Sequence, residues 1–215
     1  MKTVVDSDLL AAATAIAPAA RRVMIGLTGP PGAGKSTLAA RLVDELSRGG
    51  YTTAYVPMDG YHLANSQLNQ LGLRDRKGAP ETFDAAGYVH MLEIIASRPA
   101  YTIYAPAFNR DIEEPIAGSI AITPGTDFVV TEGNYLLLDT PPWRDIRVHL
   151  DAAWYISIPD GVRRQRLVRR HMLFGKDRRS AEAWTDGSDA RNAGLIAAYR
   201  QRADALIINS ELETF

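Results

Sequence analysis

The chain has 215 residues, a formal net charge of −1 and no cysteine. Its length fits one compact domain, and 46% hydrophobic with 23% charged residues is typical of a chain with a sizeable core and not of a disordered one. The near-neutral charge argues against a general binder of nucleic acid or of an anionic membrane. The absence of cysteine excludes disulfides, thiolate catalysis and zinc sites with cysteine ligands, and it favours a reducing, cytoplasmic location.

The N-terminal segment is rich in alanine but does not have the pattern of a signal peptide. Leu9–Ala20 is apolar, yet Asp6 and Asp8 stand where a signal peptide has positive charge. We expect a leading helix that is capped by Asp6 or Ser7 and broken near Pro18. No apolar run is long enough to span a membrane, so we expect no membrane association.

Strands and helices are predicted to alternate along the rest of the chain. The expected strands are Val23–Leu27, Thr53–Met58, Phe128–Thr131, Trp154–Ile158 and Leu206–Ile208. The expected helices are Thr37–Leu46, Thr82–Ala96, Val162–Leu173 and Gly194–Arg202, with small strands or a hairpin within Ala100–Pro124. Such alternation is typical of an α/β domain with a parallel sheet and helices on both faces. We expect a single domain over 1–215, with lid or insert segments at about 61–79, 100–125 and 162–190.

A glycine-rich loop follows the first expected strand. It consists of Gly29, Pro30, Pro31, Gly32, Ala33, Gly34, Lys35, Ser36 and Thr37. This order satisfies the pattern G-x-x-x-x-G-K-[ST], in which backbone N–H groups turn inward around phosphate oxygens and the next helix adds its positive end. Lys35 is expected to reach the outer phosphates and the Ser36 hydroxyl to bind Mg²⁺. The loop therefore predicts binding of ATP with magnesium; a plain glycine-rich turn is the alternative.

Two acidic residues close the strands that are expected beside this loop. Asp59 follows the strand at Thr53–Met58, and Glu132 follows the strand at Phe128–Thr131. The carboxyl ends of parallel strands border the ligand crevice, so both side chains are candidates for chemistry. We expect Asp59 to accept a proton from a substrate hydroxyl or to help hold Mg²⁺, and Glu132 to bind Mg²⁺ or contact the substrate. A turn-forming aspartate before Gly60 and a solvated glutamate are the alternatives.

The helix expected after Asp160 is basic. It carries Arg163, Arg164, Arg166, Arg169 and Arg170. Helical spacing places Arg163, Arg166 and Arg170 on one face. We interpret this helix as a lid, in which Arg166 and Arg170 neutralise charge on a transferred phosphoryl group. The alternative is a solvated basic face.

Further candidates for contact with a phosphoryl acceptor are Tyr61, His62, Tyr104 and Arg110. Arg110 is expected to hold the substrate, or else to pair with Asp111, Glu113 or Glu114. His62 lines the acceptor pocket or lies on the surface. The other three histidines show no spacing that would form a metal site.

Segments between Val23 and Ile208 resemble the P-loop kinases that include type I pantothenate kinase, uridine kinase and phosphoribulokinase. The segments are Met58–His62, Arg76–Asp84, Thr131–Tyr135, Arg166–Arg170 and Ala203–Ile208. The resemblance implies a three-layer P-loop fold with a five-stranded parallel sheet in the order 2-3-1-4-5. It also implies an ATP-dependent kinase that phosphorylates a hydroxyl of a small metabolite, with Asp59 as general base, Lys35 and Ser36 on the phosphates and Mg²⁺, and a lid of arginines.

The stretch between Ala100 and Gly125 is more similar to bacterial relatives labelled fructose-transport-system kinases than to pantothenate kinase itself. A sugar such as fructose is therefore the expected acceptor, and pantothenate or a nucleoside is the alternative. A regulatory P-loop ATPase is a hypothesis of another class, but the chain has no Asn-Lys-x-Asp element for reading guanine. Related kinases often pair, and the sequence leaves a homodimer open.

Overall fold

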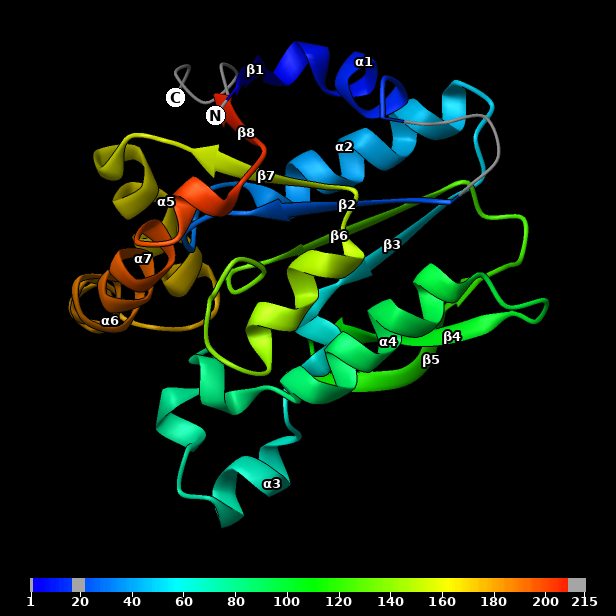
Figure 1. Cartoon of the computed structure of the whole chain (residues 1–215). Helices are drawn as coiled ribbons and strands as arrows, with labels where there is room; N and C mark the ends of the chain where they lie inside the picture. Colours follow the sequence, from blue (N-terminus) through cyan, green and yellow to red (C-terminus); the bar gives the residue numbers. More distant parts are fainter. Residues whose placement is uncertain (1, 17–21, 209–215) are drawn as a thin grey trace.

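A parallel sheet of six strands forms the centre of the computed structural model, which describes residues 2–16 and 22–208 (Figure 1). In spatial order the strands are β1 (Lys2–Val5), β8 (Ala205–Ile208), β7 (Ala152–Ser157), β2 (Val23–Thr28), β6 (Phe128–Gly133) and β3 (Thr53–Pro57). All neighbouring pairs are parallel. Every residue of β2 and β6 is buried, as expected for central strands that are covered on both faces.

The prediction of five strands in the order 2-3-1-4-5 needs correction, because the sheet has a sixth strand and the order of the whole sheet differs accordingly. The additional strand is β1, which pairs with β8 through a register that aligns Lys2 with Ala205. Without β1, the remaining strands run β8-β7-β2-β6-β3. The sequence did not reveal β1 because it is only four residues long and the alanine-rich segment beside it dominates the pattern.

Helices cover both faces of the sheet, as predicted. On one face α1 (Leu9–Thr14) and α2 (Lys35–Arg48) pack against the core, and on the other α4 (Ala85–Ser97) and the 3₁₀ turn Trp143–His149 do so. Successive strand residues point to opposite faces, so Ile25 of β2 packs on the side of α2 and Met24 on the side of α4. The sheet is therefore held between two separate hydrophobic cores.

Two segments extend the domain beyond β3. The first contains a 3₁₀ turn at Met58–Tyr61 and the short helix α3 (Asn65–Gln70), and it ends at a turn that leads into α4. The second is the predicted hairpin, formed by β4 (Ile103–Asn109) and β5 (Glu114–Ile122) in antiparallel register. Figure 1 shows both segments on the side of the sheet that carries α4.

The C-terminal third supplies the basic helix and its partners. Helix α5 (Asp160–Leu173) follows β7 and is succeeded by α6 (Arg178–Trp184), a π-helical turn at Thr185–Asp189 and α7 (Ala190–Ala197). We call residues 160–192 the lid segment.

The N-terminal helix differs from the prediction. The residue that precedes α1 is Asp8, and its side chain makes no capping hydrogen bond, because the 3₁₀ turn Asp6–Asp8 occupies the positions that were expected to cap. Pro18, the expected point of helix breakage, lies outside the described residues. Over residues 2–16 and 22–208, no helix combines the length and apolar character needed to cross a bilayer.

Candidate active site

The glycine-rich loop joins β2 to α2 in the conformation that its sequence requires. Gly32 and Gly34 have φ values of 80° and 87°, and residues that carry a Cβ rarely adopt such positive φ values. A Cβ at Gly32 would also lie 2.9 Å from Leu167 of α5, so the loop passes close beside the lid segment. The first N–H groups of α2, which begins at Lys35, remain available for phosphate oxygens.

Lys35 is buried at the start of α2. Its Nζ donates hydrogen bonds to the carbonyls of Gly29, at 2.9 Å, and Pro30, at 3.1 Å. Burial lowers the pKa of Lys35 to about 8, because protein surroundings disfavour the charged ammonium more than water does. A polyanion that binds beside this ammonium favours its charged form.

Glu132 lies at the end of β6, directly across from the loop. One of its oxygens, Oε1, accepts hydrogen bonds from Ser36 Oγ and from Tyr55 Oη, both at 3.0 Å. Burial and the nearby Asp59 raise the pKa of Glu132, while Lys35 and the two hydroxyl donors lower it. Tyr55 was not predicted, because its place beside Glu132 depends on the pairing of β3 with β6, which no local pattern shows.

The oxygens of Ser36 and Glu132 fit Mg²⁺, which prefers oxygen ligands and uses few protein groups when phosphates supply others. In the described part of the chain no cluster of three His, Asp or Glu residues could hold a metal alone.

Asp59 lies in the 3₁₀ turn after β3 and faces the same cleft. Its Oδ2 is 3.2 Å from Nη2 of Arg110, which comes from the tip of the β4–β5 hairpin. The predicted alternatives for Arg110, namely pairs with Asp111, Glu113 or Glu114, are therefore wrong. The hairpin tip folds back on Asn109, whose Oδ1 accepts the N–H groups of Asp111 and Ile112, and this turn directs Arg110 toward Asp59.

His62 forms part of an aromatic wall beside Asp59. Its Nδ1 donates to the backbone carbonyl of Asp59 at 2.9 Å, which leaves Nε2 as the acceptor in the neutral ring. The ring centroid lies 4.0 Å from that of Phe83 and 4.9 Å from that of Phe108. Burial lowers the pKa of His62, so the ring is neutral at pH 7.

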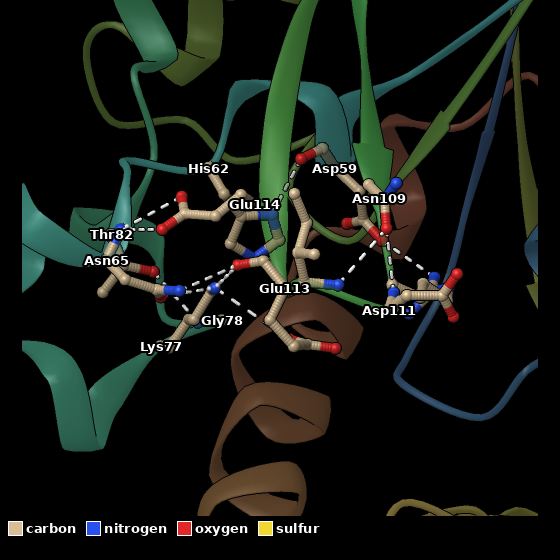
Figure 2. A network of polar contacts seen from close by, with 12 residues as sticks. Asp59, His62, Asn65, Lys77, Gly78, Thr82, Asn109, Asp111, Glu113 and Glu114 are labelled. Atoms are coloured by element: carbon tan, nitrogen blue, oxygen red, sulfur yellow. Dashed lines mark hydrogen bonds and ion pairs between the residues drawn. The ribbon is translucent and has the colours of Figure 1, made fainter.

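Side chains of the insert and the hairpin tip are joined by a polar network (Figure 2). The carboxylate of Glu114 accepts the backbone N–H of Asn65 at 3.0 and 3.2 Å. Lys77 Nζ donates to Asn65 Oδ1 at 2.8 Å and to the carbonyl of Glu113 at 2.5 Å. These contacts fix the two segments as one wall of the cleft.

Residues of the loop, β6, the insert, the hairpin tip and the lid segment line one cleft of about 570 Å³. One end, which we call the phosphate half, consists of Pro31, Gly32, Lys35, Ser36 and Glu132. The lining residues from the insert, the turn before α4 and the hairpin tip, which we call the acceptor half, are His62, Arg74, Lys77, Phe83, Phe108 and Arg110. Asp59 interacts with both halves, electrostatically with Lys35 and Glu132 and through its ion pair with Arg110, and the lid segment contributes Arg170 and His171.

The arginines of the lid segment differ in whether they line the cleft. Arg170 lines the cleft, and part of its side chain is exposed there. The surrounding protein removes water from the guanidinium and thereby lowers the pKa of Arg170. Arg166 lies about one turn before Arg170 on the same face of α5 and is not among the lining residues. Arg163 is buried and pairs with Asp160, and Arg164 pairs with Asp186. Among the two predicted catalytic arginines, only Arg170 reaches the cleft in this structure.

Two other candidates lie away from the cleft. The ring of Tyr61 is buried against Tyr88, with centroids 4.9 Å apart. Tyr104 is exposed on β4, because it alternates with the buried residues Ile103 and Ala105. The structure brings neither predicted substrate contact to the lining of the cleft.

A histidine–aspartate pair in the lid segment was not predicted. His171 Nε2 lies 2.7 Å from Asp189 Oδ2, and both residues line the cleft. The π-helical turn that ends at Asp189 directs this carboxylate back toward α5. The pair is separated by 18 residues and by a rare type of turn, so the sequence offered no local signal for it.

Comparison with known proteins places these features in a family. Residues 24–207 match the Phosphoribulokinase / Uridine kinase family. A Schizosaccharomyces pombe protein named "putative uridine kinase" is 32% identical over 202 residues, which is 90% of this chain and 86% of that protein. A pantothenate kinase of Latilactobacillus sakei is 31% identical over 86% of this chain and 67% of its own length.

A solved structure is also similar. The crystal structure of a "putative fructose transport system kinase" from Silicibacter sp. TM1040 has a TM-score of 0.86 and 35% sequence identity. The match covers 94% of this chain and 98% of that protein.

Proposed function

Because this chain belongs to the phosphoribulokinase/uridine kinase family, whose members are ATP-dependent phosphotransferases with an alcohol group as acceptor, we propose that its cleft phosphorylates a hydroxyl of a small sugar-like metabolite. The single observation that carries the proposal is the position of Asp59. Its carboxylate interacts electrostatically with Lys35 and Glu132 and pairs with Arg110, which supports a role in accepting the proton of a hydroxyl that faces a bound triphosphate.

Each residue has a role that follows from its position. Asp59 accepts the proton of the acceptor hydroxyl as the new O–P bond forms and the bond between the γ-phosphorus and the ADP oxygen breaks. Lys35 and Arg170 hold positive charge next to the transferred group, where negative charge must be stabilised. Ser36 and Glu132 would hold Mg²⁺, which neutralises phosphate charge when bound.

In this proposal the lid segment, the insert and the hairpin position the substrates and exclude water from the cleft. Arg170 and His171 are carried by α5, which packs beside the loop at Gly32. In this proposal the insert and the hairpin, which are joined by the polar network in Figure 2, hold the acceptor against Asp59. Segments of about 61–79, 100–125 and 162–190 thus belong functionally to one kinase domain.

The acceptor class is supported by the comparison with the Silicibacter protein, whose name refers to fructose transport. Fructose and related sugars are therefore the first acceptors to test, and pantothenate and nucleosides are the next. The test is ADP release with a panel of these alcohols, measured against ADP release without an acceptor. Stimulation by at least one alcohol, abolished in Asp59→Asn, is the expected result. ADP release that no alcohol stimulates would instead favour a regulatory ATPase.

A further inference from the structure

The side-chain cations that line the cleft fall into two groups. Three of them already have partners: Lys35 with loop carbonyls, Lys77 with Asn65 and Glu113, and Arg110 with Asp59. The other three are Arg74, Arg170 and Lys176. Over residues 2–16 and 22–208, the side chains of these three make no hydrogen bond or ion pair.

Arg170 belongs to the phosphate half by its electrostatics. It lowers the pKa of Lys35, so the two cations are close enough to repel each other, and a triphosphate between them removes that repulsion. Arg74 and Lys176 are placed differently. Arg74 lies in the insert, in the 3₁₀ turn Arg74–Arg76, and Lys176 follows α5, with Nζ 4.5 Å from the centroid of the Trp184 ring.

Arg74 is part of a second group of like charges. Burial lowers the pKa of Lys77, Glu113 opposes this shift, and the nearby positive charge of Arg74 lowers it further. Oε2 of Glu113 lies 3.9 Å from Nζ of Lys77, so Glu113 already forms an ion pair with a cation. Glu114 is a second acid near Lys77, and its carboxylate accepts the backbone N–H of Asn65. Among the described residues, Arg74 forms an ion pair with neither acid.

The acids of the cleft do not balance these cations. Asp59 pairs with Arg110, and Asp189 pairs with His171. Glu132 accepts hydroxyl hydrogen bonds beside Lys35. Within the described part of the chain, Asp111 is the lining carboxylate outside the phosphate half that has no ion pair, against two such cations, Arg74 and Lys176.

We propose that the acceptor alcohol carries an oxyanion, either a carboxylate or a phosphate, and that Arg74 and Lys176 bind it. The inference rests on the proposed function and narrows its substrate class. The neutral rings of His62, Phe83 and Phe108 lie on the same wall and offer apolar contact to the carbon skeleton. An anchor of this kind uses a non-reacting group of the substrate to orient the hydroxyl on Asp59.

Matched pairs of acceptors test the inference. The carboxylate arm compares gluconate with glucose and glycerate with glycerol, and the phosphate arm compares fructose 6-phosphate with fructose. We expect kcat/KM to be about tenfold or more higher for the anionic member in at least one arm, and the arm that responds identifies the oxyanion. Equal or higher kcat/KM for the neutral members in both arms would overturn the inference while leaving the kinase intact.

Variants then assign the anchor. Arg74→Gln and Lys176→Gln are expected to lower kcat/KM for the anionic acceptor about tenfold each and to leave the neutral member of the pair unchanged. The matched controls are Arg76→Gln and Arg178→Gln, because Arg76 pairs with Glu81 and Arg178 with Glu182 outside the cleft lining. The control substitutions should leave kcat/KM unchanged for both the anionic and the neutral acceptor.

Two results would count against the assignment. Equal losses for the charged and the neutral acceptor, or no loss in either variant, would show that Arg74 and Lys176 do not bind an oxyanion. If no alcohol is phosphorylated although ATP binds, the proposed function fails, and the inference fails with it. Thermal unfolding of each variant verifies that the fold is intact, as the exposed position of Arg74 leads us to expect.

Discussion

The two halves of the cleft are built by different means. In the phosphate half, side chains such as Lys35 and Glu132 are buried and extend from the ends of β2 and β6 and the start of α2. In the acceptor half, the contacts are made by partly exposed side chains from an insert and a hairpin; Arg110 is 53% exposed where it meets Asp59. Strand ends fixed by a sheet hold a common cofactor rigidly, whereas side-chain pairs on inserts can be exchanged without disturbing the core. Substrate choice is therefore expected to lie in the acceptor half.

Asp59 connects the two halves, and its replacement should have the largest effect. Asp59→Asn removes the proton acceptor but preserves the shape of the side chain, so we expect kcat to fall on the order of a thousandfold while ATP binding is kept. Steady-state kinetics and nucleotide calorimetry measure the two quantities. Asp44→Asn on the exposed face of α2 is the control. A rate close to that of the unmodified protein would show that Asp59 is not the general base.

The lid arginines test whether position in the cleft, and not charge alone, decides catalysis. Arg170→Gln should lower kcat by on the order of a hundredfold, because it removes positive charge next to the transferred group. Arg166→Gln should change kcat little, since Arg166 does not line the cleft. Equal losses in the two variants would mean that Arg166 also reaches the substrates during turnover.

Replacements of Tyr55, beside the phosphate half, and of Tyr104, on the exposed face of β4, should differ by a smaller amount. Tyr55→Phe removes a donor from Glu132, so we expect the Mg²⁺ concentration for half-maximal activity to rise by about tenfold. Tyr104→Phe should leave both Mg²⁺ dependence and acceptor KM unchanged, because its hydroxyl is on the exposed face of β4. A changed acceptor KM in Tyr104→Phe would restore the original prediction that Tyr104 contacts the substrate.

Replacement of His62 should have the smallest effect, and we expect it in the pH dependence of the free energy of unfolding. Burial lowers its pKa, so the unfolded chain takes up the proton more readily than the folded one, and stability is lost as pH falls below about 6.5. His62→Gln should therefore lose less stability between pH 7 and pH 5 than the unmodified protein, as measured by denaturant unfolding. An NMR titration of the His62 ring at or above its ordinary pKa would contradict this.

Much of the fold could be predicted because it depends on local patterns. Apolar runs marked β2, β3, β6, β7 and β8, and leucines at helical spacing marked α2. The strand β1 was missed because a short edge strand gains its stability from pairing with β8, and the paired residues, such as Lys2 and Ala205, are 203 positions apart in the chain. The strands' neighbours in the sheet could be anticipated only through resemblance to related kinases.

The loop of the phosphate half could be predicted from the sequence itself, since its nine consecutive residues contain the whole pattern that turns backbone N–H groups toward a phosphate. Sequence also placed Asp59 and Glu132 at strand ends, where a parallel sheet must expose them to the crevice. Only the tertiary structure decided that Arg110 pairs with Asp59, that Tyr55 holds Glu132 and that His171 meets Asp189. These contacts join residues from separate elements, and their distances depend on packing and register, which no single segment of the chain contains.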